Sequence, residues 1–157
     1  MNQVCAQDER TRSVIDELEY HIKALPEALG PEDFPLKHTF AKGLYIRQVT
    51  VPKGVLIISR THRFSSAAFL LKGDISIYGT EGVCRIKAPA SIITPAGTKR
   101  AVYHHEDTIF TTVHATNETD IEKIESEIYA KDINEVEKLI DVEFSVCQHA
   151  EGKCLES

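Results

Sequence analysis

The stretch Gly54–Gly73, GVLIISRTHRFSSAAFLLKG, contains the pattern that decides the fold. Two runs rich in apolar and β-branched residues, Val55–Thr61 and Ala67–Leu71, lie between its terminal glycines and are separated by a short polar segment. Runs of this length and composition favour strands, and the glycines that bound them favour turns. The stretch therefore predicts two neighbouring strands.

The same succession of short runs and turns extends to both sides of this stretch. Six further strands are predicted, over Gly43–Val51, Ile75–Tyr78, Val83–Ile86, Ser91–Thr94, Lys99–Tyr103 and Thr108–His114. Many short strands at roughly ten-residue intervals are typical of an antiparallel sandwich or barrel. We therefore predict a mainly β body over residues 34–117.

A helix is predicted before this body. Four apolar residues recur at helical spacing between Ser13 and Leu25, and Ser13 and Asp16 are spaced like a capping box. These four are Val14, Leu18, Ile22 and Leu25. Residues 1–33 are thus interpreted as an N-terminal helix followed by a proline-rich connector.

Helical spacing returns after the body, in residues 118–143. Thr119 and Glu122 are spaced as a second capping box and open a helix over residues 119–129; Asp132 and Glu135 open a shorter third helix. The apolar positions of these two helices are Ile121, Ile124 and Ile128, then Ile133, Val136 and Ile140. Residues 144–157 lack any periodicity and are predicted to be a flexible tail.

Composition excludes several classes of function. The chain has 157 residues and a formal net charge of −6, and its basic residues form no continuous run with interleaved aromatics, so nucleic-acid binding is not predicted. No apolar run is long enough for an export or membrane segment, so we expect a cytoplasmic protein without membrane contact.

The four cysteines are expected to be reduced thiols. Cys5 and Cys84 are isolated, whereas Cys147 and Cys154 flank His149 near the C-terminus. This spacing matches no common zinc motif and offers only three ligands, so it predicts no metal site.

Turn residues at Gly54, Gly73, Pro95 and Gly97 resemble the two sequence motifs of the cupin superfamily. The resemblance implies an antiparallel jelly-roll barrel. In cupins, three histidines and one glutamate from these motifs bind a divalent metal inside the barrel.

The metal ligands of that resemblance are mostly replaced. Counted from the motif glycine, Arg60 stands at the first histidine position, His62 at the second, Ala67 at the glutamate and Arg100 at the last histidine. One imidazole beside two permanently protonated guanidiniums is a poor site for a cation. We therefore expect a degenerate metal site and no cofactor.

A narrower resemblance covers residues 34–127. Its short matches resemble an uncharacterised family of small cupin proteins encoded by tailed phages, which implies a location in the host cytoplasm but no known activity. The matches are PLKH at 35–38, KGDIS at 72–76, KAP at 87–89, PAGTKR at 95–100 and EDT at 106–108.

The leading functional hypothesis is a non-catalytic cupin that binds a small, anionic ligand or a protein partner. Its predicted ligand-binding residues are Arg60, His62, Arg100, Tyr103 and His114. Strand alternation is expected to place Arg60 and His62 on one interior face beside Arg100. Buried guanidiniums need anionic partners, so an anionic ligand is favoured. The alternative partners for the two arginines are acids of the chain itself: Asp74, Glu81 or Glu106.

Two other functions remain open from the sequence. One is a metal-dependent cupin enzyme in which a divalent metal is bound by a rearranged set from His62, His104, His105 and His114. The other is a phage structural or assembly protein, since jelly rolls also build capsids. A homodimer is expected, because each predicted helix carries one apolar stripe that must be buried.

Overall fold

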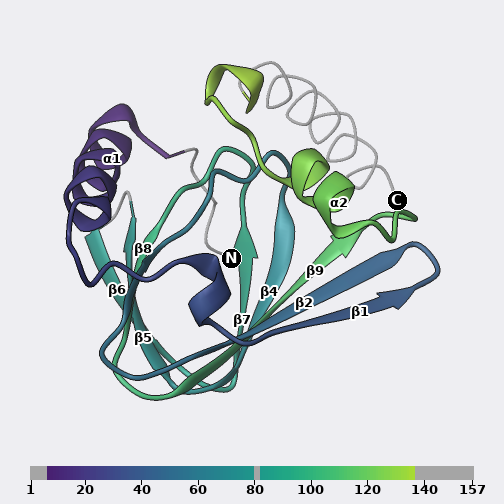
Figure 1. Ribbon diagram of the computed structural model, residues 1–157, viewed down its shortest axis with the longest axis horizontal. Coiled ribbons are helices and arrows are strands. Elements are labelled where there is room, and N and C mark those ends of the chain that lie inside the picture. The colour runs from purple at the N-terminus through teal and green to yellow at the C-terminus, as the bar shows by residue number, and fades with distance from the viewer. Residues whose placement is uncertain (1–6, 80–81, 137–157) are drawn as a thin grey trace, which may run out of the picture.

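The computed structural model describes residues 7–79 and 82–136 (Figure 1). Within them lie two α-helices, α1 (Glu9–Lys23) and α2 (Ile121–Ile128), and one 3-10 turn, η1 (Pro31–Asp33). Nine strands fill the region between the helices: β1 (Leu36–Ala41), β2 (Leu44–Val51), β3 (Leu56–Ile58), β4 (Ser66–Lys72), β5 (Asp74–Gly79), β6 (Gly82–Lys87), β7 (Ala90–Thr94), β8 (Ala101–His104) and β9 (Thr108–Ala115).

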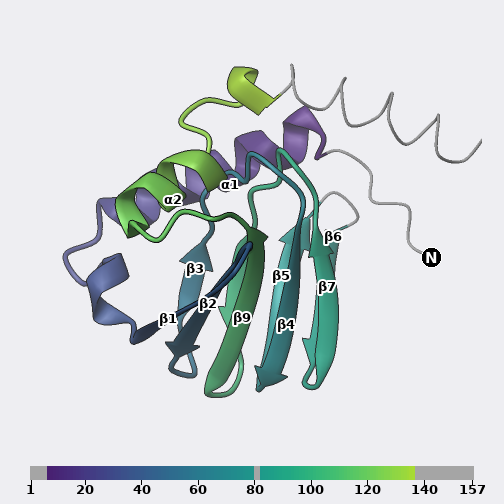
Figure 2. The same ribbon diagram turned by 90° about the vertical axis from the view of Figure 1, so that its right-hand side faces the viewer.

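The strands form two antiparallel sheets that face each other. One sheet has the order β1-β2-β9-β4-β7 and the other the order β3-β8-β5-β6, so the chain passes repeatedly between the sheets. Figure 2 shows α1 and α2 across the same end of this barrel. The mainly β jelly roll with flanking helices predicted from the sequence is confirmed.

Each strand predicted from the sequence overlaps an observed one, but β1 was missed. Its sequence, LKHTFA, is half polar, and four of its six residues are exposed because it is an edge strand paired only with β2. An edge strand need not be apolar on both faces, so it gives a weak hydrophobic signal.

One glycine of the motif resemblance is required by close packing. Gly73 has a φ of +105°, and a Cβ there would lie 2.6 Å from Oγ1 of Thr108. Only glycine adopts this backbone conformation readily and leaves that space free. The turn between β4 and β5 therefore depends on a residue that the sequence identified.

The start and the buried face of α1 differ from the prediction. Asp8, not Ser13, caps the helix by accepting a hydrogen bond from the backbone N–H of Thr11 at 2.8 Å. Ile15 is fully buried, whereas Val14 is 43% exposed. The helix turns this face inward because the chain segment that precedes β8 lies against it.

That segment is held to α1 by Lys99. Its ammonium lies 2.5 Å from carboxylate oxygens of both Asp16 and Glu19, and the side chain of Gln7 bonds to the backbone N–H and C=O of Lys99. The pKa of Lys99 is raised: burial opposes this, and the two carboxylates outweigh it. The helix thus anchors the loop that leads to Arg100.

Helix α2 covers the barrel end through apolar packing. Asp120, rather than Thr119, caps it by accepting from the backbone N–H of Lys123 at 3.2 Å. Ile124 and Ile128 pack against Tyr45 of β2. Both helices thus bury apolar residues against their own barrel, which weakens the reason given for a dimer; the homodimer stays a prediction.

Several sequence expectations fall outside the described residues. The predicted third helix is described only to Val136, with residues 134–136 helical, and Ile140, the tail and three of the cysteines lie beyond the described ranges. Cys84 is exposed and has a free thiol. None of the helices in the described ranges is long and apolar enough to span a bilayer.

Candidate functional site

A row of polar side chains crosses the barrel interior at the end covered by α2. Tyr45 of β2 pairs with His114 of β9, and Ser66 of β4 pairs with Thr94 of β7. The register that joins β4 to β9 brings Ser66 beside His114. Side chains in register on one face lie next to one another, so these four form a continuous row. All four are at least 91% buried.

Arg47 lies one step deeper on the same face of β2. It pairs with Thr112 of β9. Its Nε atom and the Oγ of Ser66 are both buried, and neither has a hydrogen-bond partner among the described residues. An unpaired buried polar atom costs about 1–3 kcal/mol, so each of these two atoms requires an explanation.

Arg47 was not among the residues predicted for the site, although the alternation along its strand indicated an inward position. Tyr45, Arg47, Val49 and Val51 alternate along one predicted strand. A charged residue on the otherwise apolar face of such a strand is a candidate interior cation.

His62 lies beside this row, on the loop that follows β3. It is 9% exposed, and its Nδ1 lies 3.4 Å from the carbonyl oxygen of Thr98. Its pKa is lowered from 6.5 to about 4. Burial is the largest cause, the Thr98 carbonyl opposes it, and the charges of Arg100, Arg47 and Arg60 lower the pKa further.

His114 is linked to both His62 and Arg47. Its Nε2 lies 3.1 Å from Oγ1 of Thr112, and its ring stacks on Tyr45 with centroids 6.0 Å apart. Burial, then the charges of His62 and Arg47, lower its pKa to about 4. Both imidazoles are therefore neutral at pH 7.

Arg100 reaches the other end of the row. Its Nη1 donates to Oγ1 of Thr94 at 3.2 Å, and its Nη2 donates to the carbonyl oxygen of Ile93 at 3.3 Å. Burial lowers the pKa of this guanidinium. Within the described residues, neither Arg100 nor Arg47 makes an ion pair. We name Arg47, His62, Arg100 and His114 the interior cationic cluster.

Arg60 does not belong to this cluster, contrary to the expectation that it shares a face with His62. Strand β3 ends at Ile58, so the two-residue alternation assumed for Arg60 and His62 is lost. The Arg60 side chain is 56% exposed and donates to the carboxylate of Glu125 of α2 at 2.9 Å.

Of the acids offered as internal partners, the two that the structure describes, Asp74 and Glu106, form no ion pair with Arg60 or Arg100. Asp74 accepts two hydrogen bonds from Arg85, each at 2.9 Å, and Glu81 lies outside the described residues. Neither Arg60 nor Arg100 has an ion pair with Glu106. The acid that pairs with Arg60 comes from α2, an element that the sequence placed outside the barrel.

Tyr103, His104 and His105 also lie apart from the cluster. Tyr103 is 40% exposed on the outer face of β8, and its ring contacts that of His105, whose Nε2 lies 2.7 Å from Oγ of Ser76. His104 points inward beside Ile75, with a buried, unpaired Nδ1. Burial is the main cause that lowers the pKa of His104 to about 4.

The four histidines of the metal-enzyme alternative are therefore not brought together. His62 and His114 are neighbours, whereas His104 and His105 face opposite sides of another sheet. In the parts of the chain that the structure describes, no three His, Cys, Asp or Glu side chains are close enough to hold a metal ion. The residues present do not fit a cupin metal centre.

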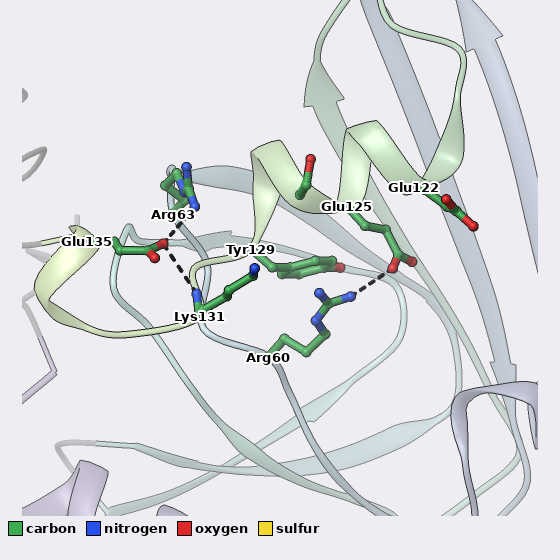
Figure 3. Close-up of a pocket in the computed structure, with 8 residues that line it drawn as sticks. Arg60, Arg63, Glu122, Glu125, Tyr129, Lys131 and Glu135 are labelled. Carbon is green, nitrogen blue, oxygen red and sulfur yellow. Dashed lines mark hydrogen bonds and ion pairs between the residues drawn. The ribbon is translucent and has the colours of Figure 1, made fainter.

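A surface pocket of about 400 Å³ lies between α2 and the loop that follows β3, and its lining includes Arg60, Glu125 and Tyr129 (Figure 3). The guanidinium of Arg60 lies 4.2 Å from the ring centroid of Tyr129, and Arg63 donates to Glu135 at 2.7 Å. Tyr129 also forms a β-bridge with His62, and their rings meet edge to face at 5.4 Å. Tyr129 therefore forms part of a wall shared by the pocket and the cluster.

No protein-family model matches the chain, and no curated protein matches it. Solved structures similar to it include an RmlC-like cupin family protein with a double-stranded beta-helix fold from Methanocaldococcus jannaschii (12% identity, TM-score 0.45, covering 54% of this chain and 81% of that one). A conserved protein of unknown function from Streptococcus pyogenes is similar at 20% identity and TM-score 0.44, covering 57% and 80%. An acetylacetone dioxygenase from Acinetobacter johnsonii is similar at 18% identity and TM-score 0.47, covering 58% and 65%.

At these identities and TM-scores, the similarity carries no substrate, metal or activity to this chain. The narrower resemblance to a tailed-phage family has no counterpart in these comparisons. The functional argument therefore depends on the residues of the site.

Proposed function

We propose that the protein is a non-catalytic, cupin-fold binding protein that takes up a small anion at the barrel end covered by α2. One observation carries the proposal: the buried Nε of Arg47 and the buried Oγ of Ser66 have no partner among the described residues, in a cluster without a carboxylate. Buried cations are normally paired, and a bound anion would supply the missing acceptors.

The charge of the cluster favours an anion over a metal ion. Arg47 and Arg100 stay protonated, so the interior carries two positive charges even when His62 and His114 are neutral. These charges repel a cation. Hydroxyl groups of Ser66, Thr94 and Thr112 add donors for a carboxylate or phosphate group.

The adjoining pocket offers a place for the rest of the ligand. Its volume of about 400 Å³ lies within the range of about 300–1,000 Å³ that is typical of small-molecule sites. Its own charges are largely paired, as the contacts of Arg60 with Glu125 and of Arg63 with Glu135 show. The buried Nε of Arg63, which lines the pocket, nevertheless has no hydrogen-bond partner among the described residues.

The resemblance to tailed-phage proteins suggests a setting for this binding role. We propose that the ligand is met in an infected host cell, because the short matches over residues 34–127 resemble proteins that phages encode. Anion binding itself does not depend on this setting.

Calorimetry against a panel of phosphate, sulfate, nucleotides and small carboxylic acids tests the proposal. We expect at least one anion to bind, and Arg47→Gln and Arg100→Gln to weaken it by roughly 30-fold, since losing a charged hydrogen bond costs about 2 kcal/mol. Arg10→Gln, in an exposed position of α1, is the matched control and should bind like the wild type.

The proposal is wrong if the wild-type protein binds none of the panel. It is also wrong if both interior substitutions leave the affinity unchanged while the variants stay folded. Stoichiometric bound metal that is lost on substituting His62 would instead favour the enzyme alternative.

A further inference from the structure

We infer that the outer face of the five-stranded sheet binds the same face of a second copy of this chain, forming a weak homodimer. This pairing does not depend on the proposed anion site. Six apolar side chains point away from the barrel on this sheet, and we name them the outer apolar face: Ile46, Ala67, Phe69, Leu71, Ile93 and Val113.

Strand alternation places these side chains outside the barrel. Leu70 of β4 belongs to the apolar cluster inside, so its neighbours Phe69 and Leu71 point outward. Phe69 is 37% exposed and Leu71 is 55% exposed. Neither described helix covers them, because α1 and α2 lie across one end of the barrel (Figure 2).

The strand register joins the outer apolar face into one continuous patch. Ile93 of β7 pairs with Ala67 of β4, and Ala67 pairs with Val113 of β9. Val113 in turn pairs with Ile46 of β2. Paired residues lie on the same side of a sheet, so an apolar row crosses four strands, with Phe69 two residues along β4 from Ala67.

The other sheet shows how a solvated outer face looks in this protein. Its strand β6 turns Arg85 and Lys87 outward, and their side chains are 57% and 72% exposed. Such a polar outer face is common in antiparallel sheets. On β2, β9, β4 and β7, all of which lie within the described residues, the one charged side chain that faces outward is Lys72 at the end of β4. The five-stranded sheet therefore lacks the charged outer face of its counterpart.

The charge distribution favours a second copy as the occupant. A two-fold dimer joins identical patches, so the patch must be complementary to itself. The net charge of −6 opposes self-association in general, but an uncharged patch adds no repulsion of its own. An aromatic centre, Phe69, and a lysine at the border, Lys72, match the apolar core and polar rim of protein interfaces. A membrane of anionic lipids would favour a cluster of basic residues, which this face lacks.

The size of the face indicates a weak dimer. From β2 to β7 the sheet spans three strand spacings of about 4.8 Å, and β4 extends for about 24 Å. With the width of the strands included, the footprint is about 450 Å² per copy. Two footprints cover about 900 Å² before the relief of the side chains is counted, which corresponds to a reversible interface and not to an obligate one.

Sedimentation velocity of the full chain over about 1–300 µM, a range that brackets a micromolar dissociation constant, tests the inference. The wild-type protein should change from monomer to dimer across this range. Ile93→Glu and Phe69→Glu should each stay monomeric throughout, because the two-fold brings two new carboxylates into a patch without cations. Val83→Glu is the matched control. Val83 is 70% exposed on β6 of the other sheet, so this variant should dimerise like the wild type.

Three results would overturn this dimer. The first is a wild-type protein that stays monomeric up to the highest concentration. The second is a dimer that persists unchanged in both face variants, which would place the contact elsewhere. The third is a monomer whose melting temperature falls more with Ile93→Glu than with Val83→Glu, which would mean that another part of the same chain covers the face. Circular dichroism checks that each variant is folded, and if one face variant unfolds, the other decides.

Discussion

The two halves of the barrel interior are built from the same strands but have opposite character. Strand β4 contributes Leu70 to one half and Ser66 to the other, and β9 contributes Phe110 and then His114. In the apolar half, Leu70, Ile75 and Ile77 form a closed cluster. In the polar half, buried donors have no partner within the described residues. We interpret the first half as the source of stability and the second as the candidate site.

His104 is the exception within this division. It lies on the inward face of β8, opposite Ile75 of the apolar cluster, and its buried Nδ1 has no partner among the described residues. Unlike His114, it has no cation among the causes of its lowered pKa beyond the neighbouring His105. Each half therefore contains a buried polar atom without a hydrogen-bond partner among the described residues, but only the polar half also contains arginines.

The largest expected effect is acid destabilisation. His62, His104 and His114 have pKa values of about 4 in the folded protein and 6.5 when exposed, so the unfolded chain binds their protons first. Stability should be fully present above pH 6.5 and fall as the pH drops toward 4, by about 3 kcal/mol for each histidine. Urea denaturation across this pH range measures it.

The variant His104→Leu shows how much of this pH-dependent loss of stability comes from the histidine in the apolar half. It should reduce the loss of stability between pH 6.5 and 4 and leave stability at pH 7 unchanged or higher, because an apolar side chain replaces an unpaired polar one. A pH dependence identical to that of the wild type would contradict the assignment of His104 as a buried neutral residue.

The next effect contrasts matched truncations in the two halves. Leu70→Ala removes a fully buried side chain from the apolar cluster and should cost about 2–5 kcal/mol. Ser66→Ala, four residues earlier on the same strand, removes an unpaired hydroxyl and should change stability by less than about 1 kcal/mol. Equal losses in chemical denaturation would show that the polar half also stabilises the fold.

The smallest effect concerns the surface outside the barrel. The pair of Arg60 and Glu125 is largely solvent-exposed, so a double-mutant cycle with Arg60→Gln and Glu125→Gln should give a coupling of about 0.2–1 kcal/mol. A coupling several times larger would mean that this pair fixes α2 over the cluster, and the pocket would then belong to the polar half.

Three of the candidate site residues could be placed near one another from the sequence because their signal was local. His62, Arg100 and His114 follow from motif register or from their place in a strand, and the structure brings them together. Arg60 was placed wrongly because its strand was predicted to extend three residues beyond Ile58. Tyr103 was assigned to the site because strand alternation alone does not say which face of β8 is inside.

By itself, the sequence determined the mainly β class, most of the strands and the existence of helices at both ends. These depend on the backbone preferences of consecutive residues and on glycines such as Gly73, which are local properties. Only the tertiary structure decided that Arg47 lies inside the barrel and Arg60 outside it. That choice depends on contacts between distant segments: the pairing of β2 with β9, and the position of α2 beside the loop after β3.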